Sequence, residues 1–168
     1  LRNKVYLAGI LGVADAALTM DYASNEATIK YRHVTLEAFC MTGGVLGGWY
    51  SGVKSVSSTI TGCTNSGTID CWNTDDEPNG GNMGAASKDV TSYSYVGGIC
   101  GVGDCTDKKF INCTNTGRIA VYNQVKTRIG GILGYTNVNP DGCVNKGRIN
   151  YCRYNPKENG GNGEIGGV

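Results

Sequence analysis

The residues of this chain best equipped for chemistry are eight cysteines, a single histidine and one short acidic run. One histidine cannot supply the His-Glu-x-x-His motif of a zinc protease. No Gly-x-Ser-x-Gly elbow accompanies His33 to support a serine hydrolase. Asp75, Asp76 and Glu77 are the densest acidic cluster, in a Gly- and Asn-rich stretch that is poorly suited to holding paired carboxylates. We therefore predict no catalytic residue and no cofactor. The alternative is a polysaccharide lyase or hydrolase that uses this acidic cluster.

The cysteines lack the Cys-x-x-Cys spacing of a zinc ribbon, so we also predict no metal site. Three of them, Cys63, Cys113 and Cys143, begin copies of one phrase, Cys-x-Asn-x-Gly-x-Ile. If the copies stack, these cysteines form an inner column of small buried groups. Neighbouring rungs would also bring one pair within disulfide distance, so both interpretations stay open.

The spacing within the phrase predicts extended strands, because side chains of a strand point alternately to opposite faces. Cysteine, asparagine, glycine and isoleucine share one face, and the residues between them are nearly all polar. A buried amide is costly unless it is hydrogen bonded, and stacking at about 4.8 Å lets each asparagine bond to the next. We expect the glycine to turn a corner at positive φ. Including the degenerate copy at 23–29, the predicted asparagine ladder contains Asn25, Asn65, Asn115 and Asn145.

A second phrase, of the form Gly-Gly-x-x-Gly, alternates with the first. One copy of the asparagine phrase lies between each consecutive pair of glycine phrases, which defines four units. The prediction is an all-β fold, a right-handed parallel β-helix (β-solenoid) in which each unit buries the inner face of its neighbour. The second unit carries an insertion loop at 72–89. The predicted units are residues 9–43, 44–97, 98–130 and 131–166.

Composition supports a single turn-rich β-domain over residues 1–168, since the chain has 27 Gly and only 3 Pro. The formal charge of +1 gives no field that would favour nucleic acid, and no apolar run is long enough to insert in a membrane. The opening residues 1–17 resemble a signal peptide, but "AGILG" matches the glycine phrase better. Because the last residues stop within that phrase, we expect a fragment of a longer chain.

The aromatic side chains give the candidate ligand-binding residues. Counting along the strand after each isoleucine places Trp72 and Tyr122 on the outer face, with Trp49, Tyr50 and Tyr135 beside the glycine corners. Exposed aromatic faces stack on sugar rings or anchor protein contacts. The alternative is lateral packing under the insertion loop. A mild basic surface is best explained by solubility; its members are Arg32, Arg118, Lys126, Arg128, Lys146 and Arg148. The same count predicts an interior column of Tyr31, Cys71, Val121 and Tyr151.

The order of the two phrases resembles the GLUG-motif repeats of bacterial surface proteins, through "GILG", "GVLG" and "GILGY". The accompanying "CTNTG" pattern is similar to that of adhesin-like proteins from gut bacteria. The resemblance implies an extracellular or cell-surface repeat region, in adhesins or beside the protease domain of immunoglobulin-cleaving metalloproteases, and it carries no catalytic residues. We therefore expect a noncatalytic domain that binds a glycan or a host surface protein, or that spaces neighbouring domains of the same longer chain.

Overall fold

The computed structural model describes residues 4–33, 39–50, 58–73, 94–104, 108–122, 127–152 and 163–166. Within these ranges the chain forms twenty β-strands and no helix. The described ranges accordingly contain no helix that is long and apolar enough to cross a membrane. The all-β class predicted from the glycine-rich, turn-rich composition is confirmed.

Five strands recur in the same order in each of the first three coils, and the fourth coil repeats all of them except the third. The first coil contains β1 (Lys4–Ala8), β2 (Leu11–Ala14), β3 (Thr19–Asp21), β4 (Ser24–Asn25) and β5 (Ile29–His33). The second contains β6 (Phe39–Gly43), β7 (Leu46–Tyr50), β8 (Ser58–Thr61), β9 (Thr64–Asn65) and β10 (Ile69–Asn73). The third contains β11 (Ser94–Gly97), β12 (Cys100–Asp104), β13 (Lys108–Ile111), β14 (Thr114–Asn115) and β15 (Ile119–Tyr122). The fourth contains β16 (Thr127–Gly130), β17 (Leu133–Thr136), β18 (Val144–Asn145) and β19 (Ile149–Cys152), and β20 (Gly163–Gly166) follows it.

Equivalent strands of successive coils pair in parallel to give five sheets. We call them the first inner sheet (β1-β6-β11-β16-β20), the second inner sheet (β2-β7-β12-β17), the side sheet (β3-β8-β13), the ladder sheet (β4-β9-β14-β18) and the outer sheet (β5-β10-β15-β19). Register follows the sequence repeat, since Ile69 lies opposite both Ile29 and Ile119. This is the stacked parallel architecture of a β-solenoid.

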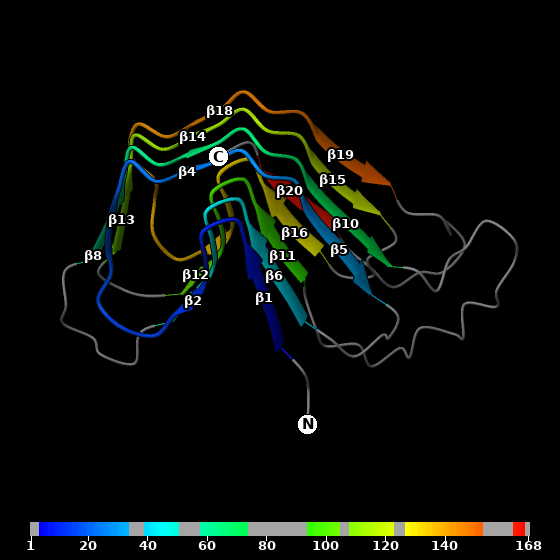
Figure 1. The fold of residues 1–168 in the computed structure, drawn as a ribbon, viewed down its shortest axis with the longest axis horizontal. Helices are drawn as coiled ribbons and strands as arrows, with labels where there is room; N and C mark the ends of the chain where they lie inside the picture. The colour runs from blue at the N-terminus through cyan, green and yellow to red at the C-terminus, as the bar shows by residue number, and fades with distance from the viewer. Residues whose placement is uncertain are drawn as a thin grey trace, which may run out of the picture.

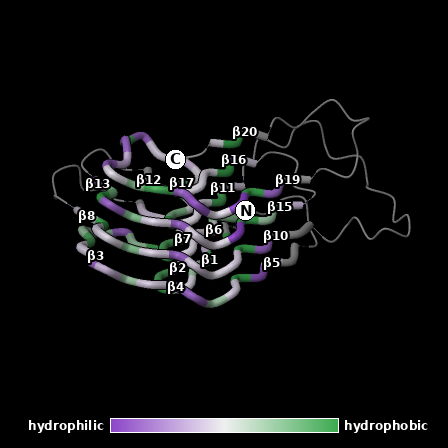
Figure 2. Tube along the Cα trace, turned by 90° about the horizontal axis from the view of Figure 1, so that it is seen from above, coloured by the Kyte–Doolittle hydropathy of each residue, from purple (hydrophilic) through white to green (hydrophobic). Residues whose placement is uncertain are grey.

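The sheets form two nested arches. In Figure 1 the side, ladder and outer sheets make a wide arch, and the two inner sheets make a narrower arch beneath it. Figure 2 shows the coils lying on one another as layers, with apolar and polar segments recurring at the same place in each layer. The space between the two arches is therefore enclosed by strands on both sides (Figure 1), and it holds the hydrophobic core.

Two clusters of buried side chains fill the space between the arches. One joins the second inner sheet to the side sheet and contains Leu46, Trp49, Ile60 and Phe110, all 0% exposed. The other joins the first inner sheet to the outer sheet, where Tyr31, Cys71, Val121 and Tyr151 form the predicted interior column. Burying one large aliphatic or aromatic side chain stabilises the fold by about 1.5–3 kcal/mol, and each coil repeats this contribution.

The four asparagines of the repeated phrase are hydrogen bonded in series. Each amide Nδ2 donates to Oδ1 of the asparagine in the next coil at 2.8 Å, from Asn25 to Asn65, to Asn115 and to Asn145. The same Nδ2 also donates to the main-chain oxygen two residues further on, at 3.0 Å in Asn65 and Asn115. Asn65 and Asn115 are fully buried. All bonds run in one direction, an arrangement in which each bond polarises the next.

The glycine phrase is explained by its contact with this ladder. A Cβ added to Gly44 would overlap the side chain of Asn65 and the main-chain oxygen of Gly98. A Cβ on Gly98 would likewise overlap the side chain of Asn115. The second glycine of each pair therefore lets the narrow arch approach the amides of the wide arch. The two repeated phrases form a single packing unit.

The predicted reason for the glycine inside the asparagine phrase is wrong. Among the described residues, positive φ occurs one position before the cysteine column, at Tyr22 (56°), Gly62 (62°), Asn112 (53°) and Gly142 (61°). Gly117 has no positive φ. A Cβ there would instead overlap the main-chain oxygen of Gly67 in the coil below and lie 2.8 Å from Nδ2 of Asn65. Close stacking of coils, rather than a corner, requires glycine at this position.

The ends of the predicted units and the insertion are only partly described. The opening residues form β1 and β2, which pair in register with β6 and β7 as a regular coil. The insertion predicted at 72–89 lies outside the described residues from position 74 onward, and so does the acidic cluster of Asp75, Asp76 and Glu77.

Candidate functional site

Two tyrosines and an arginine gather in the bend between the two inner sheets. Tyr95 of β11 lies opposite Arg128 of β16 in the first inner sheet. The rings of Tyr95 and Tyr135 lie 5.2 Å apart between centroids at 42°, and Arg128 Cζ is 5.1 Å from the centroid of Tyr135. We call Tyr95, Arg128 and Tyr135 the tyrosine–arginine cluster. It combines stacked aromatic faces with a cation, and all three side chains are half-buried.

Strand geometry aims these side chains away from the core. Ile129 is 2% exposed and packs in the core, so its neighbour Arg128 points to the opposite face of β16. In β17, a Cβ on Gly134 would lie 2.6 Å from the main chain of Val96, which shows how closely the two inner sheets meet. Tyr135 follows that glycine, and its register partner in the third coil is Val102. The fourth coil therefore carries an aromatic side chain where the third carries an aliphatic one.

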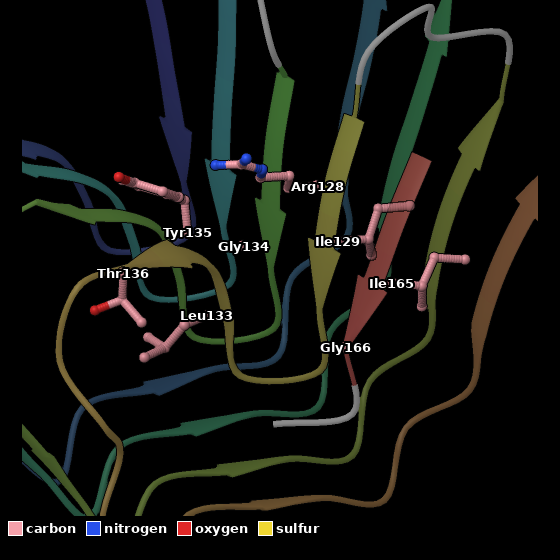
Figure 3. Close-up of a pocket in the computed structure, with 8 residues that line it drawn as sticks. All are labelled: Arg128, Ile129, Leu133, Gly134, Tyr135, Thr136, Ile165 and Gly166. Atoms are coloured by element: carbon pink, nitrogen blue, oxygen red, sulfur yellow. The ribbon is translucent and has the colours of Figure 1, made fainter. Parts of the chain in front are cut away.

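A cavity of about 380 Å³ lies beside the cluster. Figure 3 shows Arg128 and Tyr135 extending to the same side of their strands, whereas Ile129 and Ile165 extend to the other side. Ile165 also lines the cavity and is 55% exposed, but its side chain extends to the side of the sheet opposite the cluster (Figure 3), so the groups that face a ligand beside the cluster are aromatic and cationic. This volume lies at the lower end of the range for small-molecule sites. The lining residues are Arg128, Ile129, Leu133, Gly134, Tyr135, Thr136, Ile165 and Gly166.

The face predicted around Trp72 and Tyr122 is described only in part. The two residues are register neighbours in the outer sheet, as the repeat predicts. Tyr122 is half-buried rather than fully exposed, and its hydroxyl accepts a hydrogen bond from Arg118 Nη2 at 2.9 Å. The side chains of Trp72 and Tyr50 lie outside the part of the chain that the structure describes. Binding at Trp72 and Tyr50 therefore stays a prediction.

Trp49 does not belong to a binding face, which corrects its place among the candidates. Its side chain is 0% exposed, packs edge-on against Phe110 with centroids 6.0 Å apart, and donates from Nε1 to the main-chain oxygen of Ala16 at 3.1 Å. Leu46, three residues earlier, is buried in the same cluster. Strict alternation would put these two residues on opposite faces, so β7 departs from the regular pattern that the prediction assumed.

Sequence reasoning missed Tyr95 and assigned Arg128 only to the basic surface. Both residues precede a Gly-Gly pair by the same distance, in "YVGG" and "RIGG". Aligning the glycine phrases would have placed them on neighbouring rungs of one face. The signal was present, but it lay before the repeated phrase rather than within it.

Cys63, Cys113 and Cys143 form the predicted inner column, which we call the thiol column. Their neighbours Thr64, Thr114 and Val144 pair in register, so the three cysteines occupy consecutive rungs. All three are free thiols; Cys63 and Cys113 are buried and Cys143 is half-buried. The hydrogen bond with Cys113 lowers the pKa of the Cys143 thiol to about 7. The pKa of Cys113 is raised by its hydrogen bonds with Cys143 and with Cys63 and by its burial.

The described residues contain no group of three or more His, Cys, Asp or Glu arranged to hold a metal ion. The thiol column is no exception, because its outer members are two rungs apart, roughly 9.6 Å, whereas one zinc ion needs sulfurs at about 2.3 Å. What the site offers chemically is therefore stacking, cation contact and thiol chemistry.

Comparison of the chain with protein-family models, with curated protein sequences and with solved structures gives no match in any of the three.

Proposed function

We propose that this chain is a noncatalytic, extracellular repeat domain of a bacterial surface protein that binds a glycan through the tyrosine–arginine cluster. The observation that carries the proposal is the contact of Tyr95, Tyr135 and Arg128 beside a cavity of about 380 Å³. The resemblance to GLUG-motif repeats supports the surface location. The stacked coils support a second, mechanical part of the same function, which is to space neighbouring domains of a longer chain.

The chemistry of the cluster favours a sugar. A tyrosine face packs against the C–H face of a sugar ring, and the phenol hydroxyl remains available for hydrogen bonds. Arg128 already lies over the ring of Tyr135, and a guanidinium fixed in this way donates in a fork that matches a carboxylate. A host surface protein would use the same groups as an aromatic anchor, and it is the other outcome of the test below.

The test is a glycan-array screen, with affinities of the hits measured by calorimetry for the unmodified protein and for Tyr135→Ala. Loss of one stacked ring is expected to weaken binding at least tenfold, or about 1.4 kcal/mol. Tyr122→Ala tests the face predicted from the sequence, because Tyr122 is also a half-buried tyrosine beside an arginine but lies in the outer sheet; binding through the cluster leaves its affinity unchanged. Glycan ligands whose affinity ignores Tyr135 would show that the cluster is not the site, and binding confined to host proteins would replace the glycan.

A carbohydrate-active enzyme remains the alternative prediction. It depends on Asp75, Asp76 and Glu77, which lie outside the described residues. Release of fragments from a panel of acidic and neutral polysaccharides, abolished by Asp75→Asn or Asp76→Asn, would support this alternative and contradict a noncatalytic role.

A further inference from the structure

The thiol column places three sulfur atoms on consecutive rungs, with spacing suited to a covalent bond. Paired strands lie about 4.8 Å apart, within the range of about 4.4–6.8 Å between Cα atoms that a disulfide accepts. Three thiols can form only one bridge among themselves. The structure must therefore favour one of two pairs, Cys63 with Cys113 or Cys113 with Cys143.

Each sulfur leans toward the preceding coil. Cys143 Sγ lies 3.5 Å from the main-chain oxygen of Phe110 and 3.3 Å from the main-chain nitrogen of Cys113, both in the third coil. Cys113 Sγ lies 3.5 Å from the main-chain oxygen of Ile60 in the second coil. The sulfur of Cys143 is therefore already directed at Cys113. The two side chains already interact, since the hydrogen bond with Cys113 is the largest cause of the lowered pKa of Cys143.

Accessibility separates the two possible pairs. Cys63 and Cys113 are 0% exposed, whereas Cys143 is half-buried, in the coil whose strand β18 forms one edge of the described ladder sheet. A soluble oxidant can reach Cys143 before it can reach either of the others. Oxidation must begin at this end of the column, and the first partner available to Cys143 is Cys113.

We propose that Cys143 and Cys113 form a reversible disulfide when the protein meets a small-molecule disulfide, and that Cys63 remains a thiol. The bridge links the third and fourth coils two residues before the ladder asparagines Asn115 and Asn145, and so it holds in place the coil that carries Tyr135.

The chemistry is a two-step thiol–disulfide exchange. The Cys143 thiolate attacks one sulfur of the oxidant RSSR, the S–S bond breaks, and RS⁻ leaves and takes up the proton that Cys143 lost. Cys113 then attacks Cys143 Sγ in the mixed disulfide, its proton passes to the second departing RS⁻, and the internal S–S bond forms. Two protein thiols are oxidised and one RSSR is reduced to two RSH, so atoms and electrons balance.

The hydrogen bonding of the column favours this order. The hydrogen bond with Cys113 lowers the pKa of both Cys143 and Cys63 to about 7. Cys63 is 0% exposed, so Cys143 supplies the attacking thiolate that an oxidant can reach near neutral pH. The raised pKa of Cys113 results first from its contact with Cys143. Formation of the mixed disulfide at Cys143 removes this largest cause, so the attack by Cys113 becomes easier, whereas the hydrogen bond with Cys63 and burial still raise its pKa.

Cys40 and Cys100, which lie outside the thiol column, do not share these properties. Cys40 is buried, its Sγ lies 3.0 Å from Thr42 Oγ1, and burial raises its pKa to about 11. Cys100 is 0% exposed and donates to the main-chain oxygen of Val102 at 3.2 Å. These cysteines serve as internal controls for selective oxidation.

The test incubates the folded, reduced protein with oxidised glutathione at pH 7.5, blocks remaining thiols with an alkylating agent in denaturant, and maps peptides by mass spectrometry without reduction. A linked pair of peptides containing Cys113 and Cys143, lighter by two hydrogens, is expected, together with alkylated Cys63 and Cys40. The bridge must disappear on addition of a reducing thiol. A background with Cys105→Ser and Cys152→Ser, whose side chains lie outside the described residues, removes competing partners.

Alanine variants complete the design, because Ala23 occupies the column position in the first coil and shows that alanine fits there. Cys143→Ala must leave Cys113 reduced and free of glutathione, whereas Cys63→Ala must still form the bridge between Cys113 and Cys143. The proposal is overturned by a Cys63–Cys113 bridge, by glutathione that persists on Cys143, or by a Cys143 that stays reduced while circular dichroism shows a folded chain.

Discussion

Replacing Asn115 by alanine is the sharpest test of the ladder. The Asn115 side chain accepts from Asn65 Nδ2 at 2.8 Å and donates to Gly117 O at 3.0 Å and to Asn145 Oδ1 at 2.8 Å. Alanine leaves one N–H of Asn65 and the main-chain oxygen of Gly117 without these bonds in a dry site. Each buried unsatisfied group costs about 1–3 kcal/mol. We expect the free energy of unfolding to fall by about 2–6 kcal/mol, a large part of the stability of a typical domain.

Two further substitutions serve as comparisons for this change in the free energy of unfolding. Asn145 is half-buried in the last described coil, where water can replace its lost partners, so Asn145→Ala is expected to cost only about 1 kcal/mol. Ser66 follows the ladder residue of the second coil and is exposed, so Ser66→Ala is expected to change stability by less than about 0.5 kcal/mol.

Urea denaturation followed by far-ultraviolet circular dichroism measures all three changes. The reasoning is refuted if Asn115→Ala costs no more than Ser66→Ala, because the amides would then be neither dry nor connected. An Asn115→Asp variant tests the direction in which stability depends on pH. Its carboxyl would face acceptor oxygens, which raises its folded pKa above the usual value of about 3.9. Its stability is therefore highest below pH 4 and is lost as the pH rises through the folded pKa.

Three other predictions use matched positions. Gly47→Ala is expected to destabilise by about 1–3 kcal/mol, because the new Cβ would lie 2.5 Å from Gly12 O and 2.8 Å from Leu7 O. Gly12→Ala, one coil earlier, would meet only Tyr6 O at 3.5 Å and should be close to neutral in the same denaturation assay; equal effects would contradict the packing explanation. Tyr22→Gly should stabilise by about 0.5–1 kcal/mol, because glycine adopts the φ of 56° without strain, and a loss of thermal stability would show that the ring of Tyr22 matters more than its backbone. Alkylation of Cys143 by iodoacetamide should rise about tenfold between pH 6 and pH 8, as a pKa near 7 requires, whereas a rise of about a hundredfold would indicate an unperturbed thiol.

The sequence predicted the stacking and its inner face because these depend on period-two alternation within repeated phrases. Cys113, Asn115 and Gly117 are buried as that alternation requires, and the alternating residues Thr116 and Arg118 are exposed. Such information is local, so a single chain carries it. The register of Cys71 opposite Val121 followed from counting alone.

The binding surface was harder to predict, because it depends on how two sheets face each other. Trp49 is buried where β7 departs from alternation, and no neighbouring residue type indicates that departure. Tyr95 and Tyr135 come from different coils and different sheets, and their contact follows from the sharp bend at the paired glycines. The reason for Gly117 also needed coordinates, since the oxygen that excludes a side chain there belongs to Gly67, 50 positions earlier.

The pairing of rungs is independent of how much chain joins one coil to the next. Ile29, Ile69 and Ile119 remain opposite one another, although the first and second of these are 40 positions apart and the second and third are 50. The junction after β10 therefore tolerates extra sequence without disturbing the stack, which makes it a natural point for grafting a foreign peptide. A domain built in this way can change the segments that join its coils while its stacked strands stay the same.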